Sequence, residues 1–153
     1  MKYIASLALL ATAIFSSSAN ASLDLCSSNH RLFDYEKNSF FFPNNICNSG
    51  NEICLDVHGT FKTDIPPANS EVIFHARKGD ISEEWRVGVY SSLKVPAAPI
   101  GKNYRGFIRV CTYLPPKFGE TKNTDIDISV KITRPGENNP DIVICLDGSL
   151  HLN

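Results

Sequence analysis

The sequence lacks most of the features that mark a functional class. After the first 21 residues, no apolar run approaches the ~20 residues that a transmembrane helix needs. Fifteen Lys and Arg residues stand against sixteen Asp and Glu residues without forming a block of either sign. Electrostatics therefore indicate neither nucleic acid nor an anionic membrane surface as a partner. Helical periodicity never persists beyond a turn, which argues against a helical fold.

Recognisable catalytic motifs are also missing. The chain has no nucleophile elbow, phosphate-binding loop or HExxH helix. Asp56, His58 and Thr60 share one side of an extended segment and suggest a catalytic set, but such spacing is typical of any solvated strand face. Metal-ligand spacing is absent, since there is no C-x2-C pair and the histidines are scattered, at His30, His58, His75 and His151. We therefore predict a non-enzymatic protein without cofactor or metal.

What is present begins with a leader. Lys2 is followed by an apolar run over residues 4–15, and Ala19–Asn20–Ala21 has the small-x-small form of a cleavage site. This pattern predicts a secretory signal peptide at residues 1–21 and one mature domain at residues 22–153. We expect a secreted protein, located in the extracellular fluid, the periplasm or the lysosomal lumen.

Five cysteines follow the leader, so disulfide bonds are expected and one thiol is left over. Cys47 and Cys54 are separated by a turn-forming run, which makes them the simplest pair to propose. Cys26 and Cys145 lie near the two ends and would join them. Cys111 is then the unpaired cysteine, which is a reactive thiol, a buried and inert one, or one paired with another molecule.

The segment 53–65 organises the rest of the chain. Its odd-numbered residues, from Ile53 to Ile65, are mostly apolar, whereas its even-numbered residues include Asp56, His58 and Asp64. Strict alternation of this length predicts a long strand with one dry and one wet face. Such a strand needs a second layer to cover its dry face.

Further segments alternate in the same way, and each is bounded by Pro, Gly or Asn. The pattern predicts one strand or two short ones over 30–42, and single strands over 71–77, 84–93, 104–114, 125–133 and 142–152. In the last of these, Ile142 and Ile144 are both expected on the dry face. Seven or eight strands without helices predict an all-β, immunoglobulin-like sandwich of two antiparallel sheets.

Large apolar side chains are abundant for a domain of this size. They form either a filled core or the walls of an apolar slot between the sheets, and periodicity alone does not separate these alternatives. In either case the dry faces supply the same residues, namely Val57, Phe61, Phe74, Trp85, Val87, Val89, Ile108, Ile128, Val130, Ile144 and Leu146.

The order of the cysteines resembles that of the ML (lipid-recognition) domain family, which includes Niemann-Pick-type sterol carriers and fungal phospholipid-transfer proteins. An early cysteine stands in Leu23–Asp24–Leu25–Cys26, a close pair precedes the long strand, and Cys145 stands in the last one. The resemblance implies Cys26–Cys145 and Cys47–Cys54 bridges and a lipid slot between the sheets. The family often has a third pair in a mid-chain loop, where this chain has only Cys111.

These observations lead to two functional hypotheses. The first is a secreted carrier, a monomer, that holds a lipid or sterol between its sheets and engages a membrane or a receptor protein. The alternative is a secreted interaction module with a filled core, which binds a protein or glycan through its loops or an edge strand. An apolar cavity of at least ~300 Å³ would favour the carrier.

Overall fold

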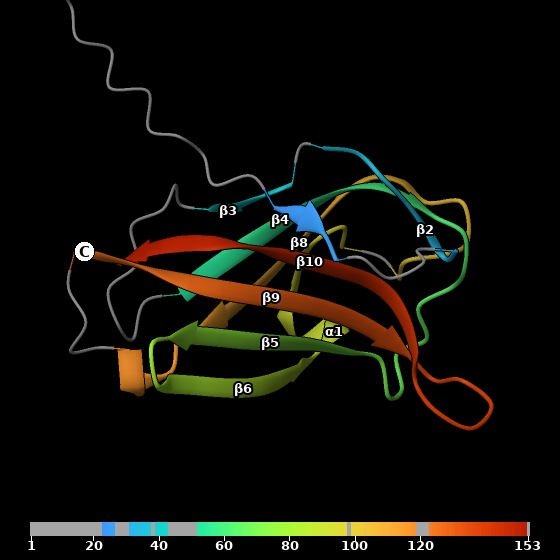
Figure 1. Ribbon diagram of the computed structural model, residues 1–153. Coiled ribbons are helices and arrows are strands. Elements are labelled where there is room, and N and C mark those ends of the chain that lie inside the picture. The colour runs from blue at the N-terminus through green and yellow to red at the C-terminus, as the bar shows by residue number, and fades with distance from the viewer. Residues whose placement is uncertain are drawn as a thin grey trace, which may run out of the picture.

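The computed structural model describes residues 23–26, 31–37, 39–42, 52–97, 99–118 and 123–152. In this part of the chain, ten strands form two antiparallel sheets that pack face to face (Figure 1). The predicted all-β sandwich is confirmed. The strand count exceeds the predicted seven or eight because β1 and β7, of two and three residues, are too short to produce a visible alternation. The predicted signal peptide, residues 1–21, lies outside the described residues.

One sheet has the strand order β1-β10-β9-β5-β6, and four of these strands lie across the front of Figure 1. Its strands are β1 (Asp24–Leu25), β10 (Asp141–Leu152), β9 (Thr124–Arg134), β5 (Glu71–Lys78) and β6 (Ile81–Gly88). The other sheet contains β2 (Phe33–Tyr35), β3 (Phe40–Phe42), β4 (Glu52–Phe61), β8 (Arg105–Tyr113) and β7 (Leu93–Val95). In this second sheet, β2 and β3 pair with the same edge of β4, and β8 lies between β4 and β7.

The predicted organising strand is present as β4, although it ends at Phe61 rather than Ile65. Its dry face points inward as expected, and its inward residues are at most 3% exposed where they are apolar. The strand ends where the chain turns toward Pro66–Pro67. Gly59 is required here, because a Cβ atom at this position would lie 2.2 Å from the backbone oxygen of Asp34.

The predicted strand over 84–93 is wrong in its second half. β6 ends at Gly88, the short helix α1 (Val89–Ser92) follows, and β7 then joins the opposite sheet. The hydroxyl groups of Ser91 and Ser92 both donate to the carbonyl oxygen of Gly88, at 2.9 Å each. These local bonds stabilise a turn in place of a sheet ladder. Val89 in this turn is still buried in the interior that both sheets share, so the apolar alternation continues past the end of β6.

A smaller correction concerns β10. Ile142 is 44% exposed, whereas Val143 is fully buried, because the pairing with β9 shifts register between Ile142 and Ile144. A bulge of this kind reverses the faces on one side of it. From Ile144 onward the predicted dry face is buried, with Gly148 partly exposed between its leucines.

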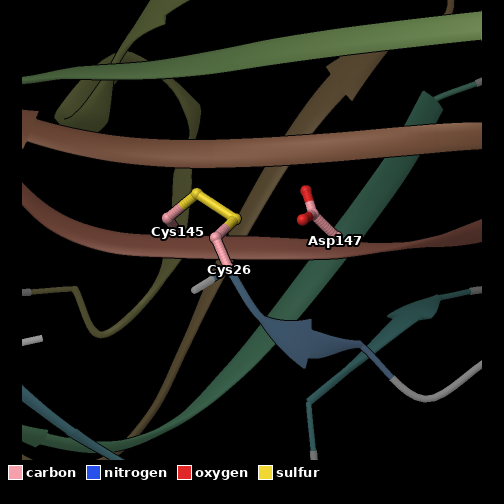
Figure 2. Close-up of side chains that lie close together, drawn as sticks. All are labelled: Cys26, Cys145 and Asp147. Atoms are coloured by element: carbon pink, nitrogen blue, oxygen red, sulfur yellow. A yellow bond between two sulfur atoms is a disulfide. The ribbon is translucent and has the colours of Figure 1, made fainter. Parts of the chain in front are cut away.

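The structure contains two disulfide bonds among the described cysteines. The Cys26–Cys145 bond is confirmed, with a Cα–Cα distance of 5.3 Å, and Figure 2 shows it joining the segment after β1 to β10. The other bond, Cys54–Cys111, shows that the predicted Cys47–Cys54 bridge and the free Cys111 thiol were wrong. Cys54 and Cys111 are direct partners on β4 and β8, 4.0 Å apart at Cα, so sheet register and not nearness in sequence selects the pair. Cys47 lies outside the described residues.

The interior between the sheets is a single apolar cluster. Pairs of aromatic rings run through it, with Phe33 edge-on to Phe61 at 4.9 Å and Phe74 stacked on Trp85 at 5.3 Å between centroids. After β8, the short 3-10 helix η1 (Pro116–Phe118) places the fully buried Phe118 in this cluster. None of the helices in the described ranges is long and apolar enough to cross a membrane.

Candidate functional site

The eleven residues predicted to line the interior lie together around it. Nine of them are at most 2% exposed, and the other two, Trp85 and Val87, are partly buried on β6. Both sheets contribute, as do strands far apart in sequence, and none of the eleven side chains carries a charge. The interior therefore interacts with a ligand mainly through apolar contact and shape.

This interior is closely filled by the protein's own side chains. The largest fully buried side chains include Phe33, Phe61, Phe74 and Phe118, which come from both sheets and from η1. A ligand of lipid size therefore needs space that these side chains occupy, because closely packed interiors hold few voids larger than a water molecule. Binding between the sheets requires that the sheets part or that rings move.

A pocket of about 270 Å³ opens on one side of the sandwich, and we call it the side pocket. Its walls come from β4, β6, α1, β7 and β8, and include Val87, Ser91, Ser92, Lys94, Thr112 and Tyr113. Of these residues, sequence reasoning identified only Val87. Thr112 was predictable, since it shares a face with Ile108 and Val110, but the side pocket itself depends on where β7 begins.

A hydrogen bond links the two sheets next to the side pocket. The indole N–H of Trp85 on β6 donates to the hydroxyl of Thr112 on β8 at 3.0 Å. The indole ring also stacks on Phe74, with an interplanar angle of 12°. Trp85 thus connects a residue that lines the side pocket to a ring inside the apolar cluster.

The polar residues that suggested catalysis have structural roles. The carboxylate of Asp56 is buried and accepts two hydrogen bonds from Arg109, at 2.6 and 2.7 Å. This hydrogen bonding raises the pKa of the Arg109 guanidinium above its ordinary value, although burial opposes the rise. The His58 ring stacks on Phe107 at 5.3 Å. The expected solvated face is thus a set of cross-strand pairs between β4 and β8, and Asp56 is buried because Arg109 pairs with it.

We expect Arg109→Met to lower the free energy of unfolding by about 2–4 kcal/mol, because it leaves the buried Asp56 carboxylate without its partner. Arg105→Met is the matched control, since Arg105 lies on the same face of β8 but its side chain is 79% exposed and 3.7 Å from Glu36. The control should change stability by less than about 0.5 kcal/mol. Urea denaturation measures both, and equal losses would show that the Asp56–Arg109 pair is unimportant for stability.

Among the residues that the structure describes, two groups have the spacing of metal ligands, but both contain a disulfide. They are Cys26, Cys145 and Asp147, and Glu52, Cys54 and Cys111. Figure 2 shows the Asp147 carboxylate beside the Cys26–Cys145 bond, two residues further along β10. A metal binds the thiolate form of cysteine, and sulfur atoms bonded to each other do not offer it. Both groups are thus built around structural bridges.

A polar pocket of about 330 Å³ lies on the outer face of the β5-β9-β10 sheet. His75, Arg77, Asp127 and Asp147 border it, and Arg77 lies 3.7 Å from Asp127. Mixed, paired and largely exposed charges of this kind are typical of a solvated sheet face. The apolar interior and the side pocket are therefore the stronger candidate for function.

The fold and the interior define a two-sheet antiparallel sandwich with an uncharged apolar centre, closed by a disulfide between β10 and the segment after β1. Among solved structures, the chain is similar to a Niemann-Pick type C2 protein from Japanese carpenter ant, a member of the ML family, with a TM-score of 0.57 and 12% sequence identity. The match covers 86% of this chain and 98% of that chain, and it confirms the predicted resemblance at the level of the fold. No family model matches the sequence, and no curated protein matches it.

Proposed function

We propose that this protein binds a lipid or a sterol between its two sheets and carries it without catalysing a reaction. The observation that carries the proposal is the uncharged, apolar interior to which both sheets contribute and which includes the eleven predicted residues, in a fold of the Niemann-Pick type C2 kind. The two disulfides fit an oxidising compartment, as the proposed signal peptide requires.

Burial of apolar area is the main source of affinity in such a site. Each Å² removed from water contributes roughly 25 cal/mol, before the costs of ordering the ligand and moving side chains. Few polar groups face the interior, so the shape of the ligand selects it more than its headgroup does. The proposed ligand is therefore slender and apolar over most of its length.

A second candidate function rests on the closely filled interior. A filled core is what an interaction module needs, and β7 pairs with β8 only at Arg109 and Val110, which leaves the β8 edge beyond Val110 without a partner strand in the described part of the chain. An extended peptide could pair with this edge as an added strand. The two candidates differ in whether the purified protein contains lipid.

Extraction of the purified protein with organic solvent, followed by mass spectrometry, tests the proposal. We expect one lipid or sterol class to co-purify in a ratio approaching one per chain, and to rebind after removal. The control is the same protein unfolded and washed in denaturant before extraction, which should release no lipid. A lipid-free protein that also fails to take up lipid after refolding would favour the interaction module.

A further inference from the structure

The inner face of β6 is less covered than that of its neighbour β5. The inward residues of β5 are at most 1% exposed, whereas Trp85 and Val87 on β6 are only partly buried. The reason lies in the opposite sheet, where β7 is three residues long and pairs with β8 no further than Val110. The inward side chains are therefore least covered between β6 and the second half of β8, where the side pocket lies.

The side pocket alone is too small for the proposed ligand. Its volume of about 270 Å³ lies below the ≈300–1,000 Å³ of pockets that enclose ligands of drug size. A lipid must therefore extend from the side pocket into the apolar cluster. Thr112 lines the side pocket and accepts the hydrogen bond of Trp85, and Trp85 stacks on the buried Phe74. These two side chains stand between the side pocket and the cluster.

Other margins of the sandwich are held by bonds to backbone atoms. On the opposite side, Leu23 donates its N–H to the carbonyl oxygen of Ser39 at 3.4 Å, and the Tyr35 hydroxyl donates to the carbonyl oxygen of Leu23. At one end, the Tyr90 hydroxyl donates to the carbonyl of Ile65 at 2.6 Å and accepts from the N–H of Ile100 at 2.8 Å. These bonds fix loops and strands to each other.

On the β6 side, the backbone joins the two sheets at α1, which carries the chain from β6 to β7. Beyond α1, the polar contacts between β6 and the chain from β8 to η1 have a side chain at each end. Besides the Trp85–Thr112 bond, Lys117 after β8 pairs with Glu83 of β6 at 2.5 Å, but the side chain of Lys117 is 64% exposed. Side-chain bonds break by rotation about single bonds, without disturbing a sheet ladder. This side is therefore the one that opens with the least structural change.

We propose that the ligand passes between β6 and β8, and that the Trp85–Thr112 hydrogen bond is the latch that closes this passage. The inference rests on the proposed function, because it assumes an apolar ligand in the interior. If the latch is closed in both the free and the bound protein and open during passage, its removal accelerates binding and release by the same factor. The equilibrium dissociation constant is then unchanged.

Thr112→Val tests the latch, because valine keeps the shape of threonine and removes the hydroxyl acceptor. Thr112→Ser is the matched control that keeps it. Trp85 is the only tryptophan of the chain. When delipidated protein is mixed with cis-parinaric acid or dehydroergosterol, energy transfer from Trp85 to the bound probe can therefore be followed by stopped flow. We expect both rates to rise about fivefold in Thr112→Val, the factor that corresponds to the net free energy of one hydrogen bond. In Thr112→Ser both rates should stay within twofold of wild type.

The outcomes separate this inference from the proposed function. Binding of a probe with unchanged rates in Thr112→Val would overturn the latch and leave the carrier intact. Failure of both probes to bind wild-type protein would overturn both proposals. If Thr112→Val does not fold, Trp85→Phe removes the donor instead, and the emission of the bound probe itself reports the rates, with the same fivefold rise expected.

Discussion

Replacing Cys26 and Cys145 together by serine should lower the free energy of unfolding by about 5 kcal/mol. The bond closes a loop with a sequence separation of 119, and the entropy that such a crosslink removes from the unfolded chain grows with loop length. It also holds β1, whose two residues pair with β10, and keeps Leu23 buried. Since domains of this size are stable by only about 5–15 kcal/mol, much of the margin is lost.

Denaturant melts of the double variant measure this loss, and removal of the other bridge provides the comparison. Cys54→Ser with Cys111→Ser opens a loop with a separation of 57 and should lose about 4 kcal/mol. β4 and β8 pair at nine positions, of which this bond occupies one, so their sheet should persist. A loss below about 1 kcal/mol for Cys26 and Cys145 would contradict the expectation and imply that packing alone holds β1.

Phe74→Ala should lower the free energy of unfolding by about 3–5 kcal/mol in the delipidated protein. The ring is 1% exposed and stacks on Trp85, so its removal leaves a cavity in a closely filled interior. Phe107→Ala is the control, because Phe107 lies on the outer face of its sheet and is only partly buried. The control should lose roughly 1–2 kcal/mol.

The same pair of variants distinguishes a carrier from a filled module. In a carrier, an apolar ligand occupies space beside the cavity that Phe74→Ala creates, and binding to the folded state alone adds stability. We expect saturating dehydroergosterol or cis-parinaric acid to restore part of the loss in Phe74→Ala, without altering the difference that Phe107→Ala produces. A full loss that neither probe reduces would argue against ligand binding in the interior.

Local alternation was enough to predict most of the interior from the sequence. Phe74, Ile128 and Val130 fall on dry faces at period two, and each is buried as expected. This success has a physical reason, because the side chains of a strand alternate between faces wherever the strand lies in the fold. The inward residues were therefore predictable without knowing which strands pair.

Features that depend on pairing between distant strands were not predictable in this way. The Cys54–Cys111 bond follows from the register of β4 on β8, and Asp56 is buried because that register places Arg109 opposite it. The side pocket exists because Ser91 and Ser92 bend the chain after Gly88 and β7 begins only at Leu93, opposite Val110. One sequence contains the residues of these contacts but not the strand order that brings them together.

The outer face of β4 and β8 carries three successive rungs of different chemistry. The first is covalent, Cys54–Cys111, the second is ionic, Asp56–Arg109, and the third is the stacked His58–Phe107 pair. A slip of one strand along the other would break all three at once, and the covalent rung forbids it. These two strands thus form the stiffer wall of the sandwich, so the proposed opening beside β6 requires movement of the facing sheet and not of β4 relative to β8.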